Sequence, residues 1–229
     1  MKINTNSNTY TILYACGVVV VVAFLLAFVS SALKSPSEAN ERIDQQKQIL
    51  ASLNLRPDKS EVEAKYKEVV LADPIVNIEG IELKQNGGFD VKRKEISADN
   101  LPVFVCSVDG ETKYVIPLVG KGLWGTIWGY LALNDDCQTV YGAYFSHESE
   151  TAGLGALISE QSFQDEFKGK KIHDEEGNYL KIVKFGAKLT NPDIECDGIS
   201  GATLTTNGVS QMLQDYLKMY KNYLLIKKK

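Results

Sequence analysis

Histidine and cysteine are scarce in this sequence, which has two histidines and four cysteines among its 229 residues. No Cys-x-x-Cys pair occurs, and His147 and His173 have no cysteine or carboxylate at the spacing of a zinc site. We therefore expect no metal site. The sequence leaves open whether a disulfide forms among the three cysteines outside the long apolar run described below, which are Cys106, Cys137 and Cys196.

Fingerprints of nucleotide binding and of hydrolytic catalysis are missing as well. The sequence contains no Gly-x-Gly-x-x-Gly run and no P-loop, and no catalytic triad stands out. We expect that the chain binds no dinucleotide and has no complete active site of its own. Excess positive charge is also lacking, because 25 basic and 29 acidic residues give a formal net charge of −4. This balance is not typical of a protein that binds nucleic acid.

Charged residues are absent from Ile3 to Leu33, and the part from Ile12 to Leu33 is almost entirely apolar. A helix of this length covers about 33 Å, which is enough to cross a hydrocarbon core of about 30 Å. The run is longer than the core of a typical signal peptide, and no clear Ala-x-Ala cleavage site follows it. We therefore interpret residues 1–11 as a short tail and residues 12–33 as a single, uncleaved transmembrane helix.

The charges beside the apolar run do not orient it in a membrane. Lys2 precedes the run, whereas Lys34 and Arg42 follow it among acidic residues, so the positive-inside rule favours neither side. An N-terminal anchor in front of a large domain most often places that domain outside the cytoplasm, and we expect the same here.

Beyond the apolar run, the sequence pattern predicts an α+β protein with a mostly antiparallel sheet and flanking helices. We interpret residues 34–100 as a helical stalk and connecting segment, interrupted at Arg56-Pro57-Asp58, and residues 101–229 as the globular domain. Asp109-Gly110 predicts a β-hairpin turn. The expected strands are Pro102–Val108, Tyr114–Val119, Trp128–Leu133, Thr139–Ser146 and Lys181–Leu189, and the expected helices are Ser159–Phe167, capped by Ser159 or Ser162, and one that begins near Asn207.

The most specific feature is the run Asp-Gly-Ile-Ser-Gly-Ala-Thr from Asp197 to Thr203. It precedes the apolar face of the last predicted helix, for which Thr206 or Asn207 is the expected N-cap. Unpaired backbone N–H groups at a helix N-terminus favour a phosphate, and small residues let a bulky group approach the backbone. From the residues alone, this run is either a capped turn or an anion site.

Two further glycine-containing segments precede that run. Residues 150–155, Glu-Thr-Ala-Gly-Leu-Gly, predict a loop whose glycines permit close approach to the backbone. Residues 122–125 are Gly-Leu-Trp-Gly, and Trp124 is either a core aromatic or a flat surface for a planar ligand.

The run from Asp197 to Thr203 resembles the flavin attachment motif, Asp-x-x-Ser/Thr-Gly-Ala-Ser/Thr, of the FMN-binding domains in respiratory sodium pumps. The resemblance implies that a flavin transferase joins FMN, through its phosphate, to the hydroxyl of Thr203 as a phosphodiester. It also implies a flavin site built from the residues around that threonine, which are Asp197, Ser200, Gly201, Ala202, Leu204 and Thr205.

The two glycine-containing segments resemble parts of the same family. Residues 150–155 resemble its Glu-Thr-Pro-Gly-Leu-Gly loop, with Ala152 at the usual proline position, a change that makes the loop less rigid than in the family. The resemblance implies flavin contacts from this loop and from the Gly-Leu-Trp segment, through Glu150, Thr151, Gly153, Leu154, Gly155 and Trp124.

In this order, and behind an apolar helix, the three segments resemble the NqrC family, a family of subunits of the sodium-translocating NADH:quinone reductase. The resemblance implies a flavoprotein subunit in the bacterial inner membrane, with its soluble domain on the periplasmic side. There it would relay electrons from NADH toward ubiquinone, with the other subunits and the flavin transferase as partners and sodium export as the result. Two alternatives remain open: the related flavin-carrying subunit of the Rnf ferredoxin:NAD electron-transport complex, and a membrane-anchored binding domain without a redox role.

Overall fold

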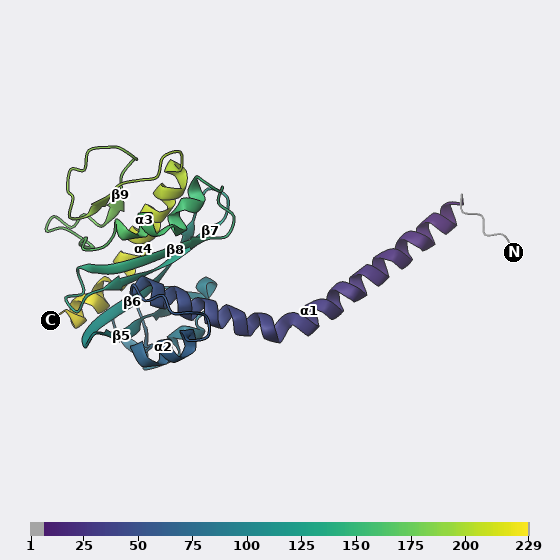
Figure 1. Cartoon of the computed structure of the whole chain (residues 1–229), viewed down its shortest axis with the longest axis horizontal. Coiled ribbons are helices and arrows are strands. Elements are labelled where there is room, and N and C mark those ends of the chain that lie inside the picture. The colour runs from purple at the N-terminus through teal and green to yellow at the C-terminus, as the bar shows by residue number, and fades with distance from the viewer. Residues whose placement is uncertain (1–6, 229) are drawn as a thin grey trace. The chain divides into compact units, whose positions relative to one another are not determined.

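The computed structural model of the chain describes residues 7–228, and the chain forms two units, Met1–Asp44 and Gln45–Lys229. Helix α1 (Asn8–Ser52) begins in the first unit and ends in the second (Figure 1). Its most apolar 18-residue window has a mean hydropathy of 2.9 and no buried residue. Among residues 7–228, α1 is the one helix long and apolar enough to cross a membrane. The helix continues through Pro36, so it extends beyond the expected membrane segment.

The end of α1 is stabilised by a Schellman motif. Asn54 adopts a left-handed conformation with a φ of 59°. Its N–H donates to the carbonyl of Ala51, and the N–H of Leu55 donates to the carbonyl of Leu50. Helix α2 (Val62–Val69) begins after Arg56-Pro57-Asp58, so the interruption that the sequence predicts there is confirmed.

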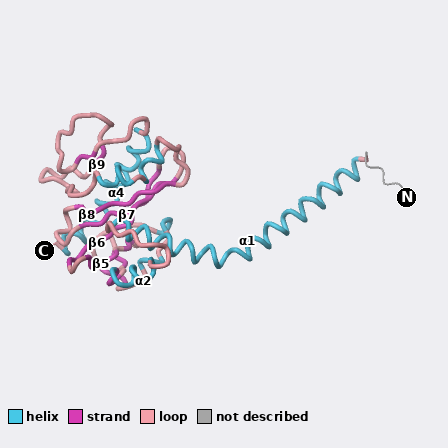
Figure 2. Tube along the Cα trace, viewed as in Figure 1, coloured by secondary structure: helices cyan, strands magenta, loops and turns pink. Residues whose placement is uncertain are grey.

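A five-stranded antiparallel sheet forms the centre of the second unit, with the strand order β1-β5-β6-β7-β8 (Figure 2). Its strands are β1 (Val70–Ala72), β5 (Phe104–Val108), β6 (Glu111–Lys121), β7 (Thr126–Leu133) and β8 (Val140–His147). The hairpin between β5 and β6 turns at Asp109 and Gly110, whose φ angles of 52° and 82° are those of a type I′ turn. The predicted α+β class and the predicted hairpin are confirmed.

Shorter elements surround this sheet. An antiparallel group has the order β3-β2-β4, and β9 pairs with β10 in parallel. The bounds are β2 (Ile75–Val76), β3 (Glu82–Lys84), β4 (Leu101–Pro102), β9 (Lys181–Ile182) and β10 (Glu195–Cys196), with 3₁₀ helices η1 (Gly88–Asp90), η2 (Arg93–Glu95) and η3 (Gly155–Ser159) and helix α3 (Gln161–Asp165). Because β4 ends at Pro102 and β5 begins at Phe104, the single strand predicted over Pro102–Val108 is two strands.

The last helix, α4 (Thr203–Lys227), packs its apolar face against β6 and β9. Its buried side chains include Val209, Leu213 and Leu217, which belong to one hydrophobic core with the sheet. Polar contacts fix its position as well. The buried hydroxyl of Tyr220 donates to the carbonyl of Pro102 at 2.7 Å, and the N–H of Ile182 donates to Ser210 Oγ at 3.2 Å. These two hydrogen bonds therefore fix the position of α4 along the neighbouring strands.

The cysteines outside the apolar part of α1 are buried free thiols. Burial raises the pKa of Cys106, Cys137 and Cys196 to about 12. Side chains of this kind act as small hydrophobic core residues.

Two sequence predictions about helix ends are wrong. The helix expected from Ser159 to Phe167 is present as the shorter α3 (Gln161–Asp165), with Glu160 rather than a serine in the N-cap position, and Ser159 is the last residue of η3. The Ser159 hydroxyl donates to the carbonyl of Ala156 within η3, and no side chain caps α3. The final helix begins at Thr203, not near Asn207.

The expected strand Lys181–Leu189 is also wrong in length, since β9 contains only Lys181 and Ile182. Its partner β10 has two residues, and the chain beyond Ile182 turns away, with the N–H of Ala187 bonded to the carbonyl of Lys184. A strand cannot continue without a neighbour to accept its backbone hydrogen bonds.

Replacement of Tyr220 by phenylalanine tests the attachment of α4. We expect Tyr220→Phe to lower the free energy of unfolding by about 1–2 kcal/mol, because it leaves the buried Pro102 carbonyl without this donor. Urea denaturation of the detergent-solubilised chain measures the change. An unchanged midpoint would show that this hydrogen bond does not stabilise the fold.

Candidate functional site

The three segments singled out in the sequence meet at one pocket of about 180 Å³. They lie far apart along the chain: the first follows β6, the second follows β8, and the third leads into α4. The lining residues are Leu123, Glu150, Thr151, Leu154, Gly155, Gly201, Ala202, Thr203, Leu204 and Thr205. Most of the site residues expected from the sequence are thus neighbours in space.

Thr203 is the first residue of α4 and is exposed, with Ala202 in the N-cap position. Its neighbour Leu204 is 61% exposed. The first backbone N–H groups of an α-helix have no acceptor within the helix, so this end of α4 favours an anion. Gly201, just before the cap, has a φ of +74° and lies against Leu154, where a side chain would collide. The exposed hydroxyl of Thr203 is therefore held at a helix N-terminus next to small residues.

The side chain of Glu150 connects the three segments. Its Oε1 accepts hydrogen bonds from the N–H groups of Trp124, at 2.8 Å, and Gly125, at 3.4 Å. Its Oε2 accepts one from the hydroxyl of Thr205, at 2.5 Å. Glu150 is only 7% exposed. One buried carboxylate thus joins the turn after β6 to the first turn of α4.

The charge of this carboxylate follows from its donors. Burial acts to raise the pKa of Glu150, but the hydrogen bonds from Thr205, Trp124 and Gly125 outweigh it, so the pKa is lowered overall. His147 lies nearby and contributes in the same direction, and its Nδ1 accepts the backbone N–H of Glu150 at 3.2 Å. Glu150 is therefore ionised at neutral pH, and His147 helps to shape the loop.

A second pocket, of about 560 Å³, is formed by residues of the same loop and motif together with α3 and the loop after β9. Its lining residues are Gly153, Leu157, Ser162, Phe163, Glu166, Phe185, Asp197, Gly198, Ile199 and Ser200. Asp197 Oδ1 accepts the N–H groups of Gly186, at 3.0 Å, and Gly198, at 2.8 Å. Asp197 thereby holds the loop that carries Phe185, which is 56% exposed. Phe185 lies inside the stretch Lys181–Leu189, where the sequence pattern predicts a strand and no site residue.

The two tryptophans have different environments. Trp124 is 68% exposed, so its interpretation as a core aromatic is wrong. A contact between Trp124 and a planar ligand stays a prediction. Trp128 on β7 is partly buried; its Nε1 donates to Gln48 Oε1 at 3.0 Å, and the guanidinium of Arg93 lies 4.0 Å from its ring centroid. Trp128 therefore fastens the end of α1 to the sheet.

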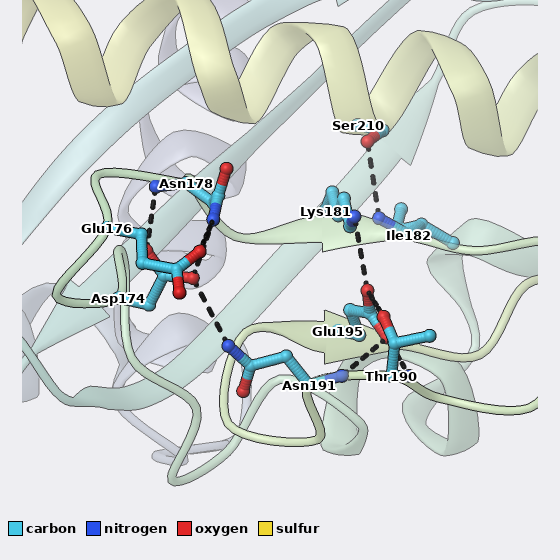
Figure 3. A network of polar contacts seen from close by, with 9 residues as sticks. All are labelled: Asp174, Glu176, Asn178, Lys181, Ile182, Thr190, Asn191, Glu195 and Ser210. Atoms are coloured by element: carbon cyan, nitrogen blue, oxygen red, sulfur yellow. Dashed lines mark hydrogen bonds and ion pairs between the residues drawn. The ribbon is translucent and has the colours of Figure 1, made fainter.

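The strand before the motif is anchored by another buried carboxylate, Glu195 on β10 (Figure 3). Its Oε2 accepts the N–H groups of Thr190, at 2.6 Å, and Asn191, at 3.1 Å, and its Oε1 accepts the Thr190 hydroxyl at 2.8 Å. The ammonium of Lys181 on β9 lies 3.1 Å from Oε1. Hydrogen bonds from Asn191 and Thr190, together with Lys181, lower the pKa of Glu195 to about 2 against the effect of burial.

The same region contains a polar pocket of about 610 Å³, larger than the two described above and lined by none of the site residues expected from the sequence. Its polar side chains bond to one another. Lys171 pairs with Asp193 at 2.7 Å. Figure 3 shows Asp174, which accepts two bonds from Asn178. Across residues 7–228, no group of three or more His, Cys, Asp or Glu side chains is placed to hold a metal ion. We interpret the polar side chains that line this pocket as a network that stabilises the segment from Lys171 to Glu195.

Comparison with known proteins gives a consistent result. A family model described as an FMN-binding domain matches residues 122–218, a range that includes all three segments. The chain is 30% identical to the NqrC protein of the Na(+)-translocating NADH-quinone reductase from Pseudomonas aeruginosa, over 93% of each protein. It is 27% identical to the corresponding protein from Vibrio alginolyticus, over 95% of this chain and 93% of that protein.

Solved structures show the same likeness. The crystal structure of the corresponding Na(+)-translocating NADH-quinone reductase subunit from Parabacteroides distasonis matches with a TM-score of 0.79 and 41% identity, over 84% of this chain and 96% of that one. The crystal structure of NqrC from Shewanella oneidensis has a TM-score of 0.73 at 23% identity, over 83% of this chain and 99% of that one, and shares the fold.

Glu195 provides a test of how the motif is supported. We expect Glu195→Gln to lower the free energy of unfolding at neutral pH by about 1–3 kcal/mol, because an amide cannot accept all the buried hydrogen bonds. The folded-state pKa lies below the unfolded value, so the stability from Glu195 is complete above pH 4.5 and is lost as the pH falls toward 2. The difference in the free energy of unfolding between the wild type and Glu195→Gln should therefore shrink as the pH falls from 4.5 toward 2.

Denaturation at a series of pH values measures this difference, and Glu175→Gln, at an exposed carboxylate of the same region, is the matched control. A difference that is as large at pH 2 as at pH 7 would contradict the assigned role of the Glu195 charge.

Proposed function

This chain belongs to the NqrC family of the Na(+)-translocating NADH-quinone reductases, and from this premise we propose that it carries one FMN joined by a phosphodiester to Thr203. Members of this family are subunits of an oxidoreductase complex and contain an FMN-binding domain. In our proposal the chain relays electrons within that complex, between NADH and ubiquinone, while the complex exports sodium. The names of the similar proteins favour NqrC over the alternative from the Rnf complex.

The observation that carries the proposal is the position of Thr203. Thr203 is exposed at the N-terminus of α4, and it lines the pocket to which all three segments contribute. A covalent acceptor must be reached by a modifying enzyme, and a threonine buried in the core could not be. The neighbouring Thr205 and Thr206 are 1% and 2% exposed, so Thr203 is the accessible threonine of this turn.

The residues present fit a flavin phosphoester. The N–H groups and the dipole at the start of α4 stabilise a phosphate. The exposed apolar side chains of Leu123, Leu154 and Leu204 border the pocket and suit a flat aromatic ring system. At about 180 Å³ this pocket is too small for a whole nucleotide, and the adjoining pocket of about 560 Å³ provides the additional room.

The attachment step needs FAD and a flavin transferase. The bond between the FMN phosphate and AMP breaks, a new bond forms from Thr203 Oγ1 to the phosphorus, the hydroxyl proton passes to the transferase, and AMP leaves. When bound, FMN supplies one- and two-electron redox chemistry. The chain itself contributes the acceptor oxygen, the helix terminus that holds the phosphate, and an apolar surface for the ring.

Membrane anchoring by α1 belongs to the same proposal. We infer that α1 spans the bacterial inner membrane and that the globular unit lies on the periplasmic side, where a covalent link would keep the flavin from being lost by dissociation. The other subunits of the complex are the proposed partners, and the flavin transferase is a partner during maturation.

Replacement of the acceptor tests the attachment. We expect Thr203→Ala to abolish the FMN adduct and Thr203→Ser, which retains a hydroxyl, to keep it. Intact-mass measurement of the chain purified from cells that express the flavin transferase gives the result, with in-gel fluorescence of the denatured band as a second readout. An FMN adduct on Thr203→Ala would indicate that the flavin is attached to another residue. A wild-type chain without an adduct would contradict the proposal.

Asp197 provides a second test, because its role in holding the loop can be separated from a role in recognition by the flavin transferase. Asp197→Asn keeps an oxygen to accept the N–H groups of Gly186 and Gly198 but loses the charge. If that charge serves the transferase, loading should fall roughly tenfold or more while thermal unfolding is unchanged, since one charge-assisted contact is lost. Asp193→Asn, at an exposed aspartate before the motif, is the control. Normal loading of Asp197→Asn would leave Asp197 with a structural role alone.

A further inference from the structure

We propose that Glu150 and Thr205 are positioning residues for flavin attachment. In this proposal, the hydrogen bond between them holds the first turn of α4, and with it Thr203, in the orientation that the modification requires. The inference rests on the proposed function, because it concerns the residue that receives the flavin. It gives these two residues a role distinct from contact with the cofactor.

Thr205 is the buried counterpart of Thr203 in the same helical turn. Successive residues of an α-helix are about 100° apart, so residues 203 and 205 point to nearly opposite sides of α4. Accordingly, Thr203 is exposed, whereas Thr205 is 1% exposed and directed toward Glu150. A force that holds Thr205 inward therefore fixes the direction in which Thr203 faces outward.

Glu150 is itself held from a different part of the chain. Its other oxygen accepts the N–H groups of Trp124 and Gly125, which belong to a turn closed by a bond from the Gly122 N–H to the Gly125 carbonyl. Hydrogen bonds to an ionised carboxylate are about twice as strong as those between neutral groups. The first turn of α4 is thus fastened to the β6–β7 connection by charge-assisted bonds, and not only by apolar packing.

Two glycines leave the space that the Glu150 carboxylate occupies. A Cβ at Gly155 would lie 2.5 Å from the Thr205 hydroxyl and 2.6 Å from Glu150 Oε2. A Cβ at Gly122 would lie 2.5 Å from Glu150 Oε1. All three contacts are shorter than real Cβ atoms allow, so the glycines of two segments make the space that this hydrogen bond occupies.

The loss of the Thr205 hydroxyl has a specific consequence. Thr205→Val keeps the volume of the side chain but removes the donor, so Glu150 Oε2 is left buried without this partner. The first turn of a helix has the fewest hydrogen bonds of its own, and it would lose its tertiary restraint. Misplacement of a reacting group by about 1 Å can cost a factor of about 100 in rate, so we expect the attachment to slow by about tenfold or more.

Thr206 provides a matched control in the same turn. It is also a buried threonine, 2% exposed, but its hydroxyl donates to the carbonyls of Ala202 and Thr203 within its own helix. Thr206→Val therefore makes the same substitution at a buried threonine of the same turn, but it leaves the hydrogen bond between Thr205 and Glu150 in place. Thr205→Ser restores the hydroxyl at the original position.

The experiment measures the initial rate of flavin attachment to the full chain in detergent. Unmodified protein is incubated with flavin transferase and FAD, and fluorescence of the denatured band is followed over time. Circular dichroism and thermal unfolding of each variant are recorded alongside. We expect Thr205→Val to be slowed about tenfold or more, and Thr205→Ser and Thr206→Val to stay within about threefold of the wild type.

A Thr205→Val variant that loads at the wild-type rate would overturn the inference. So would an equal loss in Thr206→Val, or a failure of Thr205→Ser to restore the rate, because either result would indicate a general effect on the helix. Failure of the proposed function is a separate result, since the wild-type chain would then take no adduct at Thr203.

Glu150 keeps the inference testable if Thr205→Val does not fold. Glutamine at this position can still accept the N–H groups of Trp124 and Gly125 and can donate to Thr205, whereas alanine can do neither. We expect Glu150→Gln to load within about threefold of the wild type and Glu150→Ala to be slowed about tenfold or more. Equal rates for these two variants would overturn the inference.

Discussion

The buried carboxylate of Glu150 is the constraint on which the arrangement of the site depends. An ionised group withdrawn from water is unfavourable unless hydrogen bonds replace its hydration. Here the replacements come from the backbone of the turn at Trp124 and Gly125 and from the hydroxyl of Thr205. The requirement to satisfy one carboxylate therefore brings together three segments that the chain keeps apart.

The surrounding structure makes this junction rigid. Beyond its first turn, helix α4 is bonded to Pro102 on β4 through Tyr220 and to β9 through Ser210. The strand before the motif is held by Glu195, whose acceptor oxygens are used by Thr190, Asn191 and Lys181. Thr203 is left as an exposed hydroxyl on a firmly held frame. This combination is suited to the proposed permanent attachment of a group to Thr203.

A flavin attached as we propose would also need a fixed support within the second unit. The last residues of α1 are buried within the second unit, and Gln48 accepts a hydrogen bond from Trp128 on β7. The same strand begins at Thr126, directly after the turn that Glu150 holds. The end of α1 and the turn that Glu150 holds are therefore both connected to β7. Electron transfer depends on the distance between redox groups, and a rigid strand keeps such a distance constant.

The sequence by itself determined the features that depend on local chemistry. Asp109-Gly110 specifies a type I′ turn because both residues tolerate positive φ angles, and the apolar run without charges specifies a helix suited to a hydrocarbon layer. The three glycine-containing segments could also be recognised, since each is a short, continuous pattern.

Only the tertiary structure decided how these pieces meet, because the deciding contacts join residues that are distant in the chain. α4 begins at Thr203 rather than near Asn207, so Thr206 and Asn207, the two expected N-caps, lie inside the helix, and its first turn is joined to a distant segment by the hydrogen bond from Thr205 to Glu150. β9 ends early because its partner β10 is short, and the loop that follows places Phe185 at the second pocket. Local patterns predict turns and helices, but the satisfaction of a buried charge depends on the whole fold.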